Sequence, residues 1–447
     1  MGRVTGLKHQ AVTRPIECNL LPSCFEDGRT ACEVRGVRVP NDTSHQGQLG
    51  RWPALDGLRA LAVLLVMFNH LNLSGIFGGG SIGVDIFFVL SGFLITTLLI
   101  GEFEKTRRIN FGAFYARRAL RLLPALAAVI VVAVLLVTLV RGLHPIERDT
   151  LTTLPFVIFF VGNWARVFNF NALGILGHTW SLGIEEQFYL VWPLLFALLA
   201  ARRQRERVAL LLAAIAGLVM AYRFVLLSIG QHPWSLYFRA DTHCDGLLIG
   251  CALAFWLASG KMASPLVERL FRWATVPALL IILFISELVD NSNPGEFHFM
   301  VAYGLGLGVL CAAVLIANQV TTPLSEVAAI LKSPIAVWIG RRSYGLYLWH
   351  FVVYRSVGSF FHQHHPTNAD RITELALKLG ISFVVAALSY KVIETPALRL
   401  KRRFQPTEAI PVADTIGGVD VLWETDHVQN DPSDVAPPGL TPRDTET

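Results

Sequence analysis

Apolar runs about long enough to cross a lipid bilayer follow one another along most of this sequence of 447 residues. Only 16% of the residues are charged, whereas a soluble domain carries about 25%, so much of the molecular surface must face something other than water. This pattern predicts an all-α fold, a polytopic transmembrane helical bundle of about ten spans. The predicted spans are residues 55–74, 84–101, 122–140, 180–200, 207–229, 242–259, 274–289, 299–320, 335–357 and 374–393.

The distribution of Lys and Arg predicts how these spans are oriented. Positive residues cluster in every second loop, whereas the loops at 75–83 and 290–298 contain none. The positive-inside rule therefore places both termini in the cytoplasm. A further apolar run at 151–161 is short and contains Pro155. We predict a re-entrant or interfacial segment there, because a full crossing would invert every later loop.

The polar ends of the chain have a different composition from its centre. Residues 1–50 and 405–447 are predicted to be disordered cytoplasmic tails, and 51–404 the integral-membrane domain. No Cys-x-x-Cys pair is present, so no zinc site is expected, and we interpret the histidines between 362 and 365 as part of a solvated loop. The net charge of +5 gives no reason to expect nucleic acid as a partner.

The first predicted span carries an arginine and a histidine that suggest chemistry. Arg59 and His70 are eleven residues apart, so both project from nearly one helical face, roughly 16 Å apart along the axis. A histidine within a membrane helix is costly and suggests a function. A cation at the cytoplasmic end and a base deeper in the bundle, with Asn69 beside it, suit a long anionic donor. The competing interpretation is that Arg59 contacts lipid phosphates and His70 caps the helix end.

Asp85 stands at the start of the second span, after a glycine-rich turn. A carboxylate near the membrane boundary needs a partner, and we predict that Asp85 pairs with His70 or Arg59. The Lys of a phosphate-binding loop is absent, so this turn is a weak candidate for binding phosphate. We interpret Ser91 and Gly92 as residues of close helix packing.

Three arginines, Arg117, Arg118 and Arg121, precede the third span on the cytoplasmic side. Guanidinium groups bind phosphate through two parallel hydrogen bonds, and coenzyme A presents a pyrophosphate and a 3′-phosphate. These residues therefore suit a coenzyme A site. Ordinary positive-inside topology, or contact with anionic lipid, explains the same charges.

His178, Ser181 and Glu185 share one helical face where the fourth span begins. A carboxylate in this position needs a partner or a function. We predict that Glu185 either orients a histidine base or binds an arginine, and the alternative is a structural ion pair between helices.

Two further pairs of residues complete the candidates for the pocket. Tyr347 and His350 share a face of the ninth span and are interpreted as cavity-lining, although Tyr is also common at membrane interfaces. Arg239 and Asp241 stand where the sixth span begins, and an interfacial ion pair is the alternative explanation for them.

Several ordered blocks between residues 52 and 403 carry a family resemblance. These blocks are Asp56-Gly57-Leu58-Arg59 with His70, Gly83-Val84-Asp85 with Phe87-Phe88-Val89-Leu90-Ser91-Gly92, Arg117-Arg118 with Arg121 and Pro124, Trp180-Ser181-Leu182 with Glu185, Arg239 with Asp241, Ser343-Tyr344 to His350, and Glu394 with Pro396. Their number and order resemble acyltransferase family 3, whose members are membrane O-acyltransferases of bacterial surface glycans, exopolysaccharides and some macrolide sugars.

The resemblance implies that Arg59 and His70 are important for catalysis, that the three cytoplasmic arginines are important for activity, and that Glu185 is a needed carboxylate. It also implies a multi-pass protein of the bacterial inner (plasma) membrane.

Together these features predict an O-acyltransferase that moves an acetyl or short acyl group from acyl-CoA to a hydroxyl of a carbohydrate or glycosylated lipid or natural product. His70 is expected to act as general base or to accept the acyl group itself, positioned by Glu185 or Asp85. The donor is acyl-CoA, no metal is expected, and the partners are the acceptor and the bilayer. The alternatives are a transporter or flippase for a lipid-linked sugar, and a sensor or scaffold with an inactive site.

Overall fold

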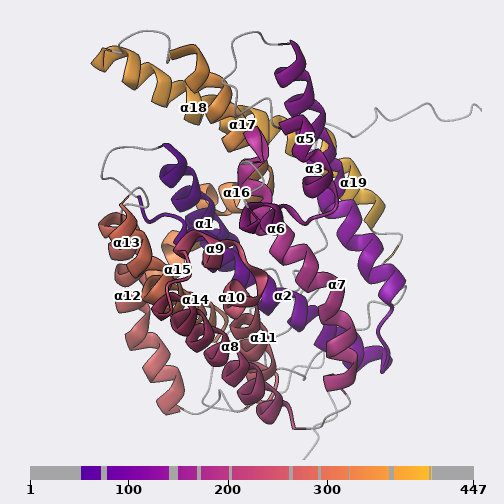
Figure 1. Cartoon of the computed structure of the whole chain (residues 1–447). Helices are drawn as coiled ribbons and strands as arrows, with labels where there is room; N and C mark the ends of the chain where they lie inside the picture. The colour runs from indigo at the N-terminus through magenta and orange to yellow at the C-terminus, as the bar shows by residue number, and fades with distance from the viewer. Residues whose placement is uncertain are drawn as a thin grey trace, which may run out of the picture. The chain divides into compact units, whose positions relative to one another are not determined.

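The computed structural model describes residues 52–71, 78–139, 150–168, 173–200, 204–260, 265–289, 293–321, 323–361, 367–401 and 404. All of them belong to one compact unit, Leu49–Thr447. The two predicted tails lie outside the described residues. Every regular element within the described ranges is a helix (Figure 1), which confirms the prediction of an all-α bundle.

Eight stretches of helix in the described part of the chain are long and apolar enough to cross a membrane. Lipid offers no hydrogen-bond partner to the backbone, so helices that satisfy their own N–H and C=O groups are the favoured way to span it. The eight are α1 (Pro53–Leu71), α2 (Ile82–Thr106), α3 (Phe111–Leu139), η2 with α7 (Gly174–Thr179, Trp180–Ala200), α8 (Arg205–Ser228), α12 (Pro265–Leu288), α13 with η4 and α14 (Pro294–Phe299, Met300–Gly304, Leu305–Val320), and α18 with η5 and α19 (Asn368–Ser389, Tyr390–Glu394, Thr395–Lys401).

Two of the ten predicted spans differ from the expectation. The span at 242–259 is α11 (Asp245–Leu257), whose 13 residues are fewer than the roughly 20 of a full crossing. The span at 335–357 is broken at Arg342 into α16 (Pro334–Arg341) and α17 (Ser343–Phe361). Ser333 starts α16 by accepting a hydrogen bond from the N–H of Ala336, and Pro334 occupies the first helical position.

The remaining helices are short and lie between the long ones. The apolar run at 151–161 forms α5 (Thr150–Ile158), whose nine residues are too few to cross, as the sequence predicts. The others are α6 (Gly162–Val167), α9 (Pro233–Phe238), α10 (Ala240–His243) and α15 (Ser325–Leu331).

Helix α2 occupies the centre of the unit, where it packs against α1 on one side and against α11 on another. Two glycines bring the backbones of α2 and α11 together. A Cβ atom at Gly92 would lie 2.0 Å from the carbonyl oxygen of Leu247, and one at Gly250 would lie 2.2 Å from that of Val89. Small residues allow this close approach, which membrane helices use in place of a hydrophobic driving force. The packing role predicted for Gly92 is confirmed.

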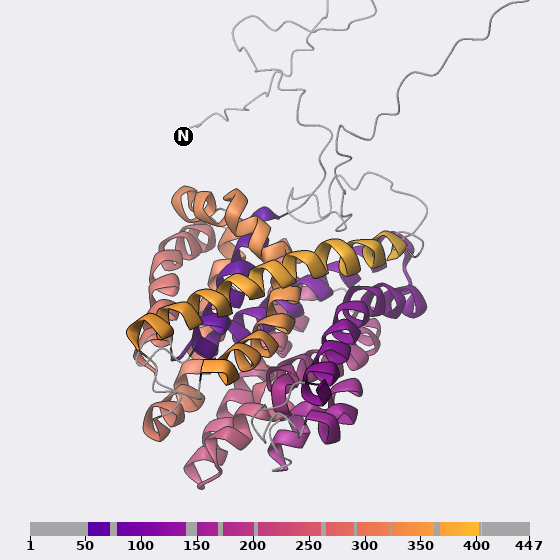
Figure 2. The same cartoon turned by 90° about the horizontal axis from the view of Figure 1, so that it is seen from above.

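Helices α17, α18 and α19 form a further group that packs beside α1 and α3. α17 packs against both α1 and α18, and α19 packs against α3. Seen from above, α18 and α19 continue one another as a long rod, drawn in amber and yellow (Figure 2). This arrangement leaves α1, α2, α3, α7 and α17 around a common space.

The α2–α11 contact predicts how one glycine substitution affects stability. We expect Gly250→Leu to lower the thermal unfolding temperature of the detergent-solubilised protein, because the new side chain meets backbone atoms that cannot move aside, and overpacking costs about 1–3 kcal/mol. The matched control is Gly217→Leu on α8, where an added Cβ meets no atom within 4 Å. Equal unfolding temperatures for the two variants would contradict this account.

Candidate active site

A cavity of about 200 Å³ lies between α1, α2, α3, α7 and α17. Its wall follows α2 from Val84 to Leu98, a length of about 21 Å at 1.5 Å per residue. The cavity is therefore long and narrow. The predicted site residues that line it are Arg59, Arg118, Arg121, Ser181, Glu185 and Tyr347.

Arginines gather at the end of the cavity that is formed by the start of α1 and of α3. Arg118 donates two hydrogen bonds to Glu186 Oε1, from Nε at 3.1 Å and from Nη2 at 2.8 Å. Its guanidinium lies 3.3 Å from the ring centroid of Tyr189, a cation–π contact. Arg59 pairs with Asp56 at 3.3 Å, and Arg121 forms part of the same wall.

Arg117 does not line this cavity, although the sequence groups it with Arg118 and Arg121. Its guanidinium pairs with Glu102 at 3.1 Å and donates to the carbonyl oxygen of Phe404 at 2.9 Å. Arg118 and Arg121 are three residues apart and therefore lie on one face of α3, the face that lines the cavity. The side chain of Arg117 lies on a different face.

Glu185 lies in the middle of the cavity wall, on α7. It accepts a hydrogen bond of 2.9 Å from the hydroxyl of Ser91. Ser91, interpreted from the sequence as a packing residue, thus also holds this carboxylate in place. Glu185 makes no contact with His70 among the described residues, so the prediction that it orients this imidazole is wrong for this structure.

A hydrogen-bonded pair of hydroxyls closes the far end of the cavity. The hydroxyl oxygens of Ser181 and Tyr347 are 2.6 Å apart, and the Tyr347 hydroxyl donates to the carbonyl oxygen of His178 at 2.5 Å. Because a phenol has one proton to donate, Ser181 must be the donor to Tyr347. The wall ends here, and His70 does not belong to it.

Three imidazoles lie directly behind this closure. The ring of His350 lies 5.1 Å from that of His70 and 5.3 Å from that of His178, measured between centroids. They come from α1, η2 and α17, so the fold gathers residues that the sequence places far apart. His178 and His350 were predicted to face the pocket, and they form this cluster next to Tyr347 instead of lining the cavity.

The hydrogen bonds of His70 and His350 define their tautomers. Nδ1 of His350 lies 3.0 Å from the carbonyl oxygen of Leu346, so Nδ1 carries the proton and Nε2 a lone pair. Nδ1 of His70 lies 2.9 Å from the carbonyl oxygen of Val66 and 3.2 Å from Nε2 of His350. Two acceptors around Nδ1 place the His70 proton there. Nε2 of His70 therefore keeps its lone pair, the arrangement that a general base needs.

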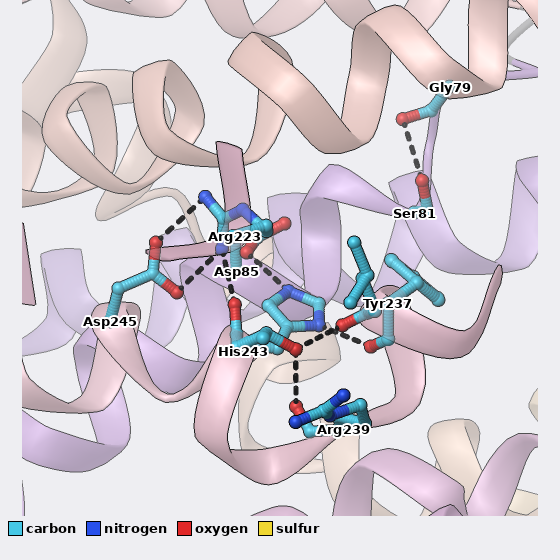
Figure 3. A network of polar contacts seen from close by, with 10 residues as sticks. Gly79, Ser81, Asp85, Arg223, Tyr237, Arg239, His243 and Asp245 are labelled. Carbon is cyan, nitrogen blue, oxygen red and sulfur yellow. Dashed lines mark hydrogen bonds and ion pairs between the residues drawn. The ribbon is translucent and has the colours of Figure 1, made fainter. Parts of the chain in front are cut away.

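Asp85 belongs to a different network, which Figure 3 shows. Its Oδ1 lies 3.0 Å from Nε2 of His243, whose Nδ1 lies 2.7 Å from the carbonyl oxygen of Tyr237. Both nitrogens of His243 thus lie next to oxygen atoms. The prediction that Asp85 pairs with His70 or Arg59 is wrong, because the start of α2 faces α10 at this point.

A buried ion pair lies beside Asp85. Arg223 on α8 donates from Nη1 and Nη2 to the two oxygens of Asp245, at 3.1 Å each, and from Nη1 to the carbonyl of Thr242 at 2.7 Å (Figure 3). Both side chains are essentially inaccessible, at 1% and 0% exposure. This network joins α2, α8, α10 and α11, and neither Asp85 nor Arg223 lines the cavity.

The remaining candidates lie away from the cavity. Arg239 holds Asp241 through bonds of 2.9 and 2.5 Å, and this contact raises the pKa of Arg239. The ion-pair interpretation therefore fits these two residues. Asn69 packs against Gly80 and is absent from the cavity wall.

Arg166 is a site residue that the sequence analysis missed. It lies on α6, with its guanidinium 4.6 Å from the ring centroid of Phe238 and beside Gly177, the neighbour of His178. The sequence feature that could have identified Arg166 is its position in a segment that the charge distribution assigns to the outer side of the membrane, where arginine is less common.

No three His, Cys, Asp or Glu side chains in the described ranges are arranged to hold a metal ion. The histidines between 362 and 365, interpreted as part of a solvated loop, lie outside those ranges.

The buried pair of Arg223 and Asp245 predicts non-additive effects on stability. We expect Asp245→Leu to cost about 3–5 kcal/mol, because it leaves a guanidinium buried without its counter-charge. The double variant Arg223→Met, Asp245→Leu should recover most of this loss, measured as the unfolding temperature in detergent. A double variant as unstable as Asp245→Leu alone would refute the uncompensated charge as the cause.

Comparison with known proteins identifies the family of this chain. A family model described as an acyltransferase domain matches residues 52–391. The peptidoglycan O-acetyltransferase OatA of Listeria monocytogenes is 35% identical over 359 residues, covering 77% of this chain and 55% of the relative. The putative peptidoglycan O-acetyltransferase YrhL of Bacillus subtilis is 35% identical over 380 residues, covering 79% and 56%.

A putative O-acetyltransferase of Staphylococcus aureus is 33% identical over 360 residues, covering 77% of this chain and 57% of the relative. The chain thus spans little more than half the length of these relatives. No solved structure matches it.

Proposed function

Because this chain belongs to the acyltransferase family whose domain model covers residues 52–391, we propose that it moves an acetyl or other short acyl group from acyl-CoA to a hydroxyl of a carbohydrate. The observation that carries the proposal is the long cavity with arginines at one end and, behind Tyr347 at the other, an imidazole with a free lone pair. The O-acetyltransferase names of the relatives support an acetyl group and an oxygen acceptor. Membership of an acyltransferase family leaves the transporter alternative without support.

The dimensions of the cavity suggest how an acyl-CoA would lie in it. A volume of about 200 Å³ is below the roughly 300–1,000 Å³ that encloses a drug-sized ligand. We propose that the acyl group and the pantetheine arm enter the cavity while the nucleotide stays at its mouth. Arg59, Arg118 and Arg121 then bind the phosphates. This orientation places the mouth on the cytoplasmic side, with both termini in the cytoplasm, as the positive-inside rule predicts.

The proposed reaction uses His70 as general base. Its Nε2 takes the proton of the acceptor hydroxyl while the hydroxyl oxygen attacks the thioester carbon. The carbon–sulfur bond then breaks, and the thiolate of coenzyme A takes up the proton from the imidazolium. His350 and the carbonyl of Val66 hold the ring in the required tautomer. The dry interior of the bundle protects the thioester from water.

Tyr347 separates the donor cavity from His70. For the thioester to meet the base, the phenol must rotate and give up its hydrogen bonds to Ser181 and to the carbonyl of His178. Two hydrogen bonds contribute about 1–3 kcal/mol together, so this closure is easily opened by a bound donor. The acceptor then approaches His70 from the opposite side.

The assignment of His70 predicts a loss of turnover without a loss of donor binding. We expect His70→Gln to lower kcat by a factor of about 10² to 10⁴, measured as transfer of labelled acetyl from acetyl-CoA to cell-envelope glycan in proteoliposomes. Calorimetry should show unchanged coenzyme A binding. His350→Phe should lower kcat by less, because it removes only the residue that positions the base. Full activity of a normally inserted His70→Gln protein would contradict the proposal. The control variant is His232→Gln, which changes an exposed histidine.

The arginines at the mouth predict a difference between two donors. Arg121→Gln should raise KM for acetyl-CoA about 10- to 100-fold, the effect of losing a charged hydrogen bond. KM for acetyl-pantetheine, which lacks the nucleotide phosphates, should not change. Arg108→Gln removes an exposed arginine of the same basic segment and should leave both values as they are. An equal loss with both donors would show that Arg121 does not contact the phosphates.

The names of two relatives suggest the first acceptor to test. Both the Listeria and the Bacillus proteins are named for peptidoglycan, so we propose a glycan of the cell envelope. Mass spectrometry of envelope glycans and secreted glycosides, compared between deletion and wild-type cells, identifies the product that disappears.

A further inference from the structure

Arg166 places a positive charge at the imidazole cluster. Its Nη2 would lie 3.2 Å from a Cβ atom at Gly177, and Phe351 borders the same position. The ring of Phe351 lies 5.0 Å from that of His70 and 5.1 Å from that of His178. Arg166 therefore stands beside the proposed base and on the far side of Tyr347 from the arginines of the donor cavity.

The guanidinium of Arg166 has no counter-charge in the described part of the chain. Its Nε is buried without a hydrogen-bond partner there, and no carboxylate pairs with the group. The absence of a counter-charge distinguishes Arg166 from two other interior arginines, since Arg118 pairs with Glu186 and Arg223 with Asp245, although Nε of Arg223 also has no hydrogen-bond partner within the described ranges. A cation without a counter-charge in the interior of the bundle lowers the stability of the protein. Stability of the fold therefore does not explain why Arg166 lies there, and binding of a ligand could.

His178 adds a second group without a partner. The residue is 2% exposed, and neither ring nitrogen makes a hydrogen bond of normal geometry among the described residues, although the backbone of Leu348 lies near the ring. A neutral imidazole always carries one N–H donor. Arg166 and His178 both carry hydrogen-bond donors, and Gly177, the residue before His178, lets the Arg166 guanidinium approach this part of the backbone closely.

We propose that Arg166 and His178 form a binding site for the negative charge of an acidic sugar, so that the acceptor carries a carboxylate or a phosphate close to the hydroxyl that is acylated. This inference rests on the proposed transfer to a carbohydrate. The planar guanidinium binds either anion through two parallel hydrogen bonds. The donor's phosphates are not the ligand of this site, because Tyr347 and Ser181 separate it from the donor cavity.

The test compares acceptors that differ only in charge. The full chain in phosphatidylcholine proteoliposomes is given labelled acetyl-CoA with methyl glucoside, methyl glucuronide or methyl glucoside 6-phosphate. We expect Arg166→Gln to raise KM for the charged acceptors about 10- to 100-fold, and to leave KM for methyl glucoside and all kcat values unchanged. Arg166→Lys should fall between, because it keeps the charge and loses the planar fork. The charged acceptor with the larger effect tells carboxylate from phosphate.

The control variant is Arg371→Gln, which removes an exposed arginine at the start of α18 and should change nothing. An equal fall in kcat with all three acceptors would overturn the inference, because Arg166 would then stabilise the thioester oxyanion or the fold. Inhibition by phosphatidylglycerol that depends on Arg166, without any preference for charged sugars, would overturn it in favour of a lipid headgroup.

A binding measurement separates this inference from the proposed function. Methyl glucuronide should raise the unfolding temperature of the wild type more than methyl glucoside does, and Arg166→Gln should abolish the difference. If the wild type acylates no sugar yet shows this difference, the proposed function fails and the anion site stands. If the wild type acylates sugars but the two glycosides raise its unfolding temperature equally, and Arg166→Gln does not change KM, the anion site is refuted and the proposed function stands.

Discussion

The close packing of α2 against its neighbours is the constraint on which the rest of the structure depends. Lipid supplies no hydrophobic force between membrane helices, so contact relies on backbones that come close. Gly83 meets the carbonyl oxygen of Ala62 on α1, while Gly92 and Gly250 do the same for α2 and α11. Held on both sides, α2 contributes one wall of the cavity and, through Asp85, one member of the buried ionic network.

Buried polar groups in this bundle fall into two kinds. Those around Asp85 and Arg223 pair with opposite or polar groups across four helices, and the low polarity around them makes such a network intolerant of losing one member. Near His70, by contrast, Arg166 has no carboxylate partner within the described residues, and its Nε and both ring nitrogens of His178 have no hydrogen-bond partner there. The cation without a counter-charge therefore lies where an anionic ligand is proposed to bind.

The thin separation between the donor cavity and the imidazole cluster suits the proposed transfer. Tyr347 contacts the cavity with its ring and the backbone of His178 with its hydroxyl. One side chain thus lies between the cavity and the imidazole cluster. We propose that acyl donor and acceptor meet only when this residue moves, which would limit hydrolysis of the thioester in the absence of an acceptor.

Local sequence patterns determined the helical class, most of the spans and the individual residues of interest, because hydropathy and helical spacing depend on neighbours within a few turns. Arg59, Arg118, Arg121 and Glu185 were recognised in this way. Their partners were not, since contacts such as Ser91 with Glu185 or His350 with His70 join residues 94 and 280 positions apart. Only the tertiary structure decided that an imidazole positions His70, that Asp85 faces His243 and that Arg166 lies at the cluster, because helix rotation and packing set which faces meet.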